Sequence, residues 1–155
     1  MRRQEGFSYV IVMFLVAALS LAAVRALEST KVAEQRDREV ELLWRGMAYR
    51  DAIHDYYENA PGSIHTHPET VAELLYDSRF TNPRRHLRKA YRDPMAADGA
   101  WELLRNEDGR VTGVRSRSAV APLKRAGFPE GFDSFAQARR YSDWQFVYIP
   151  EKKPQ

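Results

Sequence analysis

Cysteine is absent from the 155 residues of the chain. The protein therefore has no disulfide bond, and it has no zinc or iron–sulfur site built on thiolate ligands. An oxidising compartment permits disulfides without requiring them, so the missing cysteine does not indicate where the protein resides.

An excess of charge of one sign is missing too. Lys and Arg total 24 and Asp and Glu total 21, which gives a formal net charge of +3. This balance does not predict a nucleic acid as partner.

The familiar catalytic signatures are also missing. The sequence has no Gly-x-Ser-x-Gly, no phosphate-binding glycine loop and no His-Glu-x-x-His. We therefore predict that the protein is not an enzyme, and we expect no cofactor.

Proline is missing from the first sixty residues, where helix-forming residues dominate. Oppositely charged side chains stand three or four positions apart along the later part of this stretch, which favours a helix. The sequence Asn59-Ala60-Pro61-Gly62 is a typical helix stop. One helix is predicted from Phe7 to about Glu58.

A long apolar run opens this helix, because the eighteen residues from Phe7 to Val24 include no charged side chain. At about 1.5 Å per residue the run spans roughly 27 Å, close to the hydrocarbon thickness of a bilayer. Arg2 and Arg3 precede it, so the positive-inside rule predicts a cytoplasmic N-terminus and a translocated head. A secretory signal peptide cut near residues 20–22 is the alternative, although the run is long for one.

The junction Gln4-Glu5-Gly6-Phe7-Ser8, followed at once by the apolar run, resembles the leader of type IV pilins and type II secretion pseudopilins. In that family prepilin peptidase cuts after the glycine and methylates the new N-terminal amine. The resemblance implies that Gly6 ends the leader and that Phe7 becomes the methylated N-terminus. It also implies a single-pass protein of the bacterial inner membrane with a periplasmic head, possessing three kinds of partner: prepilin peptidase, other pseudopilins or pilins, and the inner-membrane assembly platform.

One position departs from the family pattern. The family has Glu at the fifth mature position, where its carboxylate pairs with the N-terminal amine of a neighbouring subunit, whereas this chain has Ile11. A charge inside a membrane is costly unless it has a function, so its absence predicts a changed role, such as a tip or accessory subunit. Ile11 and Phe14 are the candidate assembly residues of the apolar helix.

Beyond a polar stretch at residues 31–39, apolar residues recur at helical spacing and predict a face that packs on the head. The members of this stripe are Val40, Leu43, Trp44, Met47, Ala48, Ala52, Ile53 and Tyr56. The three tryptophans, Trp44, Trp101 and Trp144, are expected in the core of the head.

The head is predicted to contain a short helix at residues 68–76 and three strands at residues 101–105, 110–116 and 142–149. The turn signal Asn106-Glu107-Asp108-Gly109 joins the first two strands. Asp93-Pro94 and Ser142-Asp143-Trp144 resemble segments of the heads of major pseudopilins.

The expected organisation follows from these elements. It comprises a leader at 1–6, a transmembrane helix at 7–24, an amphipathic continuation at 25–59, a periplasmic pseudopilin head at 60–150 and a tail at 151–155. The predicted fold class is α+β: a long transmembrane-plus-amphipathic helix with a small three-stranded antiparallel sheet packed on its C-terminal half, the pilin-like lollipop.

Calcium enters through the resemblance, because major pseudopilins hold it in the loop before the last strand. The corresponding loop is basic, so we expect no metal there. If calcium were bound, the candidate ligands would be Glu130, Asp133 and Asp143.

Two other clusters invite a functional interpretation. His65 and His67 alternate in an extended segment, where we expect a solvated loop rather than a metal site. The basic segment, residues 79–92, contains six cations and no acid. A solvated or ion-paired surface is expected there, and contact with acidic neighbours or with DNA are the alternatives.

The sequence thus predicts a structural subunit of a type II secretion or related pilus-like machine, which assembles through its N-terminal helix. Two alternatives remain open. One is a minor type IV pilin whose head binds DNA or surfaces, and the other is a membrane-anchored periplasmic enzyme.

Overall fold

The computed structural model describes residues 5–62 and 65–150. Its first element is the helix α1 (Glu5–Glu58), which confirms the predicted helix. The backbone amide of Asn59 still donates to the Asp55 carbonyl, at 3.1 Å, and the chain turns at the Pro61-Gly62 signal that follows. Most of the predicted leader and the whole predicted tail lie outside the described residues.

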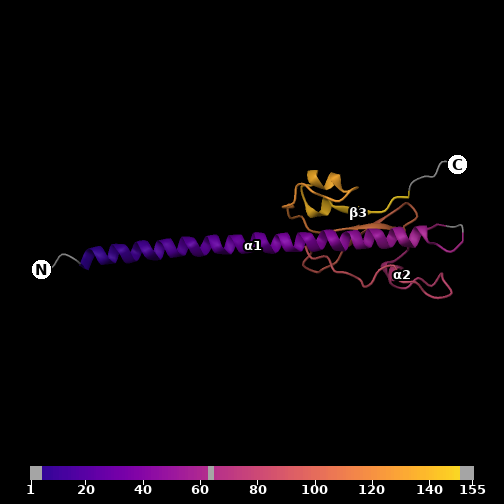
Figure 1. Cartoon of the computed structure of the whole chain (residues 1–155), viewed down its shortest axis with the longest axis horizontal. Coiled ribbons are helices and arrows are strands. Elements are labelled where there is room, and N and C mark those ends of the chain that lie inside the picture. Colours follow the sequence, from indigo (N-terminus) through magenta and orange to yellow (C-terminus); the bar gives the residue numbers. More distant parts are fainter. Residues whose placement is uncertain (1–4, 63–64, 151–155) are drawn as a thin grey trace. The chain divides into compact units, whose positions relative to one another are not determined.

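The chain divides into two units, and the boundary falls inside α1 between Asp37 and Arg38. Within residues 5–37 the first unit is helix alone. In the second unit the strands and loops lie along α1 from Arg38 onward (Figure 1). The head therefore includes the last twenty or so residues of α1, because these are the helix residues that pack on its loops and strands.

The membrane prediction concerns the first unit. Over the described part of the chain, no helical stretch is both long and apolar enough to span a membrane. The side chains of residues 5–8, 23–24 and 26–29 lie outside the described ones.

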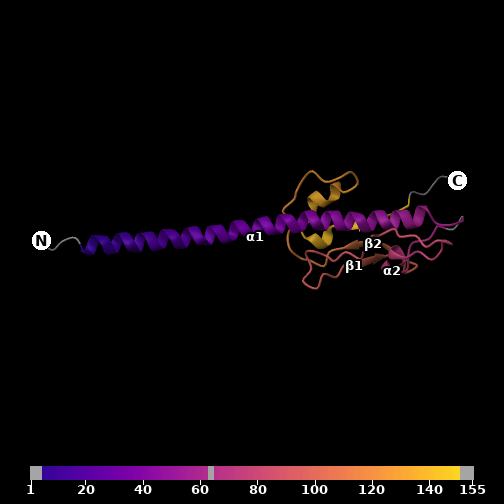
Figure 2. The ribbon, with the colours of Figure 1, turned by 60° about the horizontal axis from the view of Figure 1, so that its bottom comes forward.

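The head contains the predicted antiparallel sheet of three strands, in the order β1-β2-β3. The strands are β1 (Glu102–Arg105), β2 (Val111–Arg115) and β3 (Gln145–Val147), and β1 and β2 lie next to each other beside α1 (Figure 2). The tight turn after Asn106 is closed by the Gly109 amide, which donates to the Asn106 carbonyl at 3.0 Å. The α+β class with a long helix and a three-stranded antiparallel sheet is thus confirmed.

The predicted short helix and all three strands are shorter than expected, and the difference is largest for the helix and the third strand. The helix α2 (Val71–Leu75) occupies only the middle of residues 68–76. The third strand begins at Gln145 rather than at residue 142, because Tyr141–Asp143 forms a 3₁₀ helix, η2, whose Asp143 side chain accepts backbone N–H bonds from Arg139 and Arg140, each at 2.9 Å. A second 3₁₀ helix, η1 (Asp133–Gln137), precedes it.

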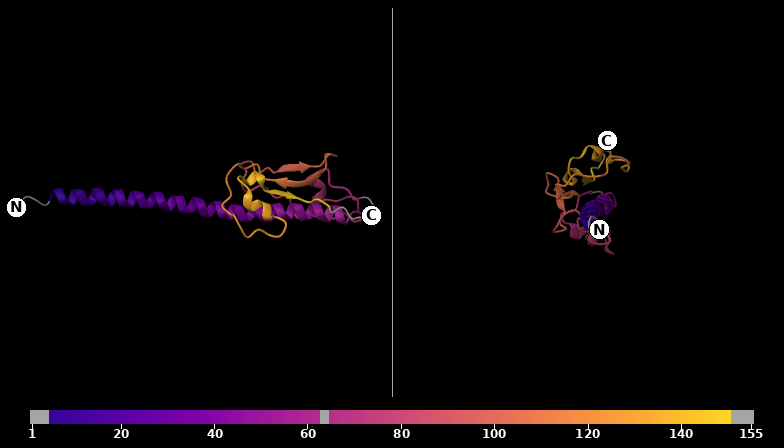
Figure 3. Two further views of the ribbon diagram at one scale, coloured as in Figure 1. Left: turned by 90° about the horizontal axis from the view of Figure 1, so that it is seen from above. Right: turned by 90° about the vertical axis from the view of Figure 1, so that its left-hand side faces the viewer.

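The core lies between the second half of α1 and the sheet, whose strands run along the helix (Figure 3). The helix contributes Leu42, Leu43, Tyr49, Ala52, Ile53 and Tyr56, all buried. From the other side come Val111, Val114 and Phe146 of the sheet, and Phe132, Phe135, Tyr141 and Trp144 of the segments before β3. Aromatic rings dominate the second group, and the Phe135 ring stacks on Trp144 with centroids 5.3 Å apart.

The three tryptophans differ in burial. Trp101 and Trp144 are buried in the core, as expected. The prediction for Trp44 is wrong, because its side chain is 51% exposed, and Val40 is exposed as well. The buried line of α1 instead runs through Glu39, Leu42, Gly46 and Tyr49, at spacings of three and four residues, so that Trp44 is left beside it.

Gly46 lies on this buried line because a side chain there would have no room. A Cβ atom placed on Gly46 would overlap the ring of Phe146. Alanine favours a helix over glycine by up to about 1 kcal/mol, but overpacking costs about 1–3 kcal/mol. We therefore expect Gly46→Ala to lower the free energy of unfolding by about 1–2 kcal/mol in urea titrations followed by circular dichroism. A variant more stable than the wild type would show that Phe146 yields without cost.

Candidate functional site

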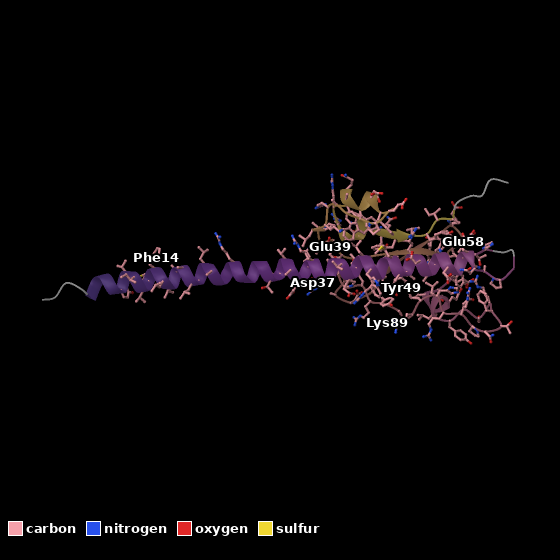
Figure 4. All side chains as sticks on the ribbon, in the orientation of Figure 1. Phe14, Asp37, Glu39, Tyr49, Glu58 and Lys89 are labelled. Atoms are coloured by element: carbon pink, nitrogen blue, oxygen red, sulfur yellow. The ribbon has the colours of Figure 1, made fainter. Side chains whose placement is uncertain are left out.

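Residues 9–22 of the first unit present an apolar helix surface on all sides. Every described side chain from Tyr9 to Ala22 is exposed, with Ile11 at 44% and Phe14 at 76%, and side chains project from both sides of the helix around Phe14 (Figure 4). The Ser20 hydroxyl donates to the Val16 carbonyl at 2.8 Å, which satisfies the polar group within the helix. Such a surface is stable only against lipid or other apolar surfaces.

The predicted processing residues stand at the start of the same helix. Gly6 and Phe7 fall within the first turn of α1, and their side chains lie outside the described ones. The structure therefore places the Gly6-Phe7 junction immediately before the exposed apolar surface.

A surface cleft of about 410 Å³ opens on the head beside α1, and we call it the Trp44 cleft. Six side chains line it: Glu41, Trp44, Arg45, Arg88, Lys89 and Tyr91. Three come from α1 and three from the segment before the sheet, which includes the labelled Lys89 in Figure 4. The exposed Trp44 is thus part of a mixed aromatic and cationic surface.

The aromatic part of the Trp44 cleft is held firmly. The edge of one ring meets the face of the other between Trp44 and Tyr91, with centroids 5.0 Å apart and planes at 80°. The Tyr91 carbonyl accepts two hydrogen bonds, from the Tyr49 hydroxyl and from the Trp101 indole N–H, both at 3.0 Å. Since Tyr49 and Trp101 are buried, these bonds fix Tyr91 to the core.

The basic segment, residues 79–92, is partly ion-paired and partly solvated, as expected. Arg79 binds Asp77, and the Arg84 guanidinium lies over the Phe80 ring, 5.2 Å from its centroid. Arg85 and Arg88 are exposed. Positive charge therefore remains available on this side of the head.

A buried polar network ties this segment to the end of α1. The Asp77 carboxylate is 1% exposed and accepts bonds from Arg79 Nε at 2.9 Å, Arg79 Nη2 at 2.8 Å and His86 Nε2 at 3.0 Å. The other ring nitrogen of His86 lies 2.5 Å from Asp55 of α1, and Arg79 also donates to the Tyr56 carbonyl at 2.8 Å. Burial raises the pKa of the Asp77 carboxyl, but the bonds from Arg79 and His86 outweigh it and lower that pKa to about 2.

Another buried carboxylate holds the loop before β3. Glu39, labelled in Figure 4, is 3% exposed and accepts the backbone amides of Leu123 at 2.9 Å and Lys124 at 2.7 Å. It also accepts the Tyr141 hydroxyl at 2.7 Å. A head with no disulfide thus fastens a long loop to the helix through one side chain.

Asp93 is a buried carboxylate that holds the chain beside the sheet. Its carboxylate is 2% exposed and accepts the Met95 amide at 2.8 Å and the Ser116 hydroxyl at 2.7 Å. The Arg117 amide lies 3.4 Å from the same group. The Asp-Pro segment noted in the sequence is therefore a structural anchor for the end of β2.

The residues considered for calcium are spread over different surroundings. Asp143 caps η2, while Glu130 and Asp133 are exposed. Among the residues that the structure describes, no three His, Asp or Glu side chains are grouped so as to hold a metal ion.

The two histidines considered as ligands differ from each other. His65 is exposed and its Nδ1 lies 2.7 Å from the Tyr57 carbonyl. The expectation of a solvated loop is wrong for His67, which is 7% exposed because its ring packs on Tyr57, with centroids 4.8 Å apart. Burial, the largest effect, lowers the pKa of His67.

Reasoning from the sequence missed Glu39, the Asp77–His86 pair and the Trp44 cleft. One signal existed for Glu39, since it stands three residues before Leu42 and seven before Gly46 on the line that is buried. No spacing rule links Asp77 to Asp55, because the contact between them runs through His86 from a distant loop.

Comparison with known proteins identifies no relative of this chain. Searches against protein-family models, curated proteins and solved structures find no match to this chain.

Proposed function

We propose that the protein is a pilin-like structural subunit, of the pseudopilin type, which assembles through its N-terminal helix. The observation that carries the proposal is the Gly6-Phe7 junction followed by an apolar helix surface that is exposed on every side from Tyr9 to Ala22. The α+β head with a three-stranded antiparallel sheet along the helix supports it.

In this proposal residues 7–24 cross the inner membrane before assembly, with the N-terminus in the cytoplasm and the head in the periplasm. Two features of the helix support that placement. The hydroxyl of Ser20 is satisfied inside the helix, as lipid requires, and Arg2 and Arg3 precede the apolar run. In an assembled filament the same surface packs against the helices of neighbouring subunits, with Ile11 and Phe14 among the contacts.

Position 11 holds isoleucine instead of glutamate, and this indicates which position the subunit takes in such a machine. A subunit without an ionisable group in its apolar helix has no charge with which to recruit the N-terminal amine of a neighbour. We therefore propose an accessory or tip position for this chain rather than a repeating position along the filament.

Processing is the direct test of the proposed function. When the full chain is co-expressed with prepilin peptidase, we expect it to become six residues shorter and to start at a methylated Phe7, as measured by mass spectrometry. We expect Gly6→Val to remain uncut, because the added side chain obstructs the extended backbone that a peptidase must bind.

Gln4→Ala is the matched control, since it changes the leader without touching the Gly6-Phe7 junction, and it should be cut normally. A mature N-terminus near Ala23 would contradict the proposal, because it would show removal of the helix by secretory signal peptidase. Cleavage of Gly6→Val at the same rate as the wild type would contradict the assignment of the junction.

A further inference from the structure

The Trp44 cleft has a ready-made apolar contact surface. Trp44 is 51% exposed although its neighbour Tyr91 is fixed to the core through Tyr49 and Trp101. An indole held in place over a rigid ring loses little conformational freedom when a partner covers it, and tryptophan is enriched among residues that dominate binding energy.

Some charged side chains around this surface are paired with other groups of the protein, and others face solvent. Arg45 is already engaged, because its Nε bonds Glu41 at 2.8 Å and its Nη1 bonds the Arg92 carbonyl at 2.8 Å. Lys89 lies over the Tyr91 ring, 5.5 Å from its centroid, and Arg88 is exposed. After Glu41 and Arg45 neutralise each other, the lining retains two positive charges next to the exposed indole.

We propose that the Trp44 cleft binds an acidic peptide segment of a partner protein. One apolar or aromatic side chain of that segment covers Trp44 and Tyr91, and carboxylates next to it pair with Arg88 and Lys89. A volume of about 410 Å³ suits one or two side chains. The inference concerns the head alone, so it holds whether or not the chain is processed as proposed above.

A peptide fits this cleft better than a nucleic acid does. Only two positive charges, those of Arg88 and Lys89, remain in the lining, which is enough for the carboxylates of a short peptide but not for a run of phosphates. The whole chain carries only +3, whereas non-specific nucleic-acid binding draws on many neutralised phosphates.

The test uses the full chain in a non-ionic detergent and three fluorescein-labelled probes. The first is a peptide with one phenylalanine flanked by aspartates and glutamates, the second has lysines in place of those acids, and the third is an oligo(dT) strand. By fluorescence anisotropy we expect saturable binding of the acidic peptide that weakens as salt is raised, and no binding of the lysine peptide. Unlabelled acidic peptide should shift the tryptophan emission to shorter wavelength, because Trp44 is the exposed tryptophan.

Variants locate the binding. Trp44→Ala should weaken the acidic peptide about tenfold or more, and Arg88→Ala about threefold to tenfold. Arg85→Ala is the matched control, since Arg85 is also exposed but lies outside the lining of the cleft, and it should change the affinity less than about twofold. Circular dichroism should show the same helix content in all variants.

Three results would overturn the inference. They are the absence of saturable binding by the acidic peptide, equal affinities for the wild type and Trp44→Ala, and tighter binding of oligo(dT) than of the peptide. The last would assign the surface to single-stranded nucleic acid.

Discussion

Asparagine in place of Asp77 should lower the free energy of unfolding of the head by about 3–5 kcal/mol. The substitution keeps the shape of the side chain but removes the charge that faces Arg79 and His86 in a site only 1% exposed. The Arg79 guanidinium is then left without its counterion, and the link from this loop through His86 to Asp55 of α1 weakens. Urea unfolding of the full chain in detergent, followed by circular dichroism, measures the change.

Asp51→Asn serves as the control for this experiment, because Asp51 is 67% exposed and pairs with its neighbour Arg50 at 3.3 Å. We expect it to change stability by less than about 0.5 kcal/mol. Equal stabilities for Asp77→Asn and Asp51→Asn would mean that the buried network contributes nothing beyond a surface pair.

The Asp77 carboxylate should also make the stability of the head depend on pH under acidic conditions. Its pKa falls from the usual 3.8 in the unfolded chain to about 2 in the folded head. A depressed pKa means that the stabilisation is present above about pH 4 and is lost as the pH falls through about 2, and its size is about 2 kcal/mol. The wild type should therefore lose more stability than Asp77→Asn between pH 4 and pH 2, and parallel losses would assign the acid sensitivity to other groups.

Trp144→Ala should be comparably damaging, with a loss of about 3–5 kcal/mol. The Trp144 side chain is 0% exposed, stacks on Phe135 and donates its indole N–H to the Phe135 carbonyl at 3.2 Å. Removing it leaves a cavity beside the rings of Phe128, Phe135 and Tyr141. Thermal and urea unfolding of the full chain measure the loss.

Trp44→Ala is the natural partner of this experiment, since it makes the same chemical change at the half-exposed position. Its cost should stay below about 1 kcal/mol, because the lost contacts are those with one side of Tyr91. If Trp44→Ala were as destabilising as Trp144→Ala, the indole of Trp44 would belong to the core. It would then not be available to contact a partner in the cleft.

The regular elements of the fold could be predicted because each has a local cause. The absence of proline up to Asn59 fixed the extent of α1, and the turn at Asn106–Gly109 fixed the pairing of β1 with β2. The burial of Trp101 and Trp144 followed from their places in the predicted strands.

The rotation of α1 about its axis could not be predicted in the same way. Val40, Trp44 and Met47 form an apolar line with spacings as regular as those of the line actually buried, yet Val40 and Trp44 are exposed. The choice between the two depends on Glu39 and Gly46, a charged residue and a small one, which apolar periodicity ignores. Glu39 is buried because distant backbone amides reach it, and Gly46 because Phe146 occupies the space above it.

The candidate sites also differ in whether the sequence alone can reveal them. The Gly6-Phe7 junction and the apolar run are continuous in sequence, so a pattern can reveal them. The Trp44 cleft and the link from Asp55 through His86 to Asp77 bring together side chains of α1 and of a later segment, and their geometry exists only after folding.

The link between Glu39 and Tyr141 has a consequence for the order of events in the cell. The two residues are 102 positions apart, and two further aromatic residues of the core, Trp144 and Phe146, follow Tyr141. At about 5–20 residues per second, a ribosome needs roughly 5–20 s to make that interval. The buried face of α1 therefore cannot be fully covered until the last strand has been made, so the head completes its folding only near the end of synthesis.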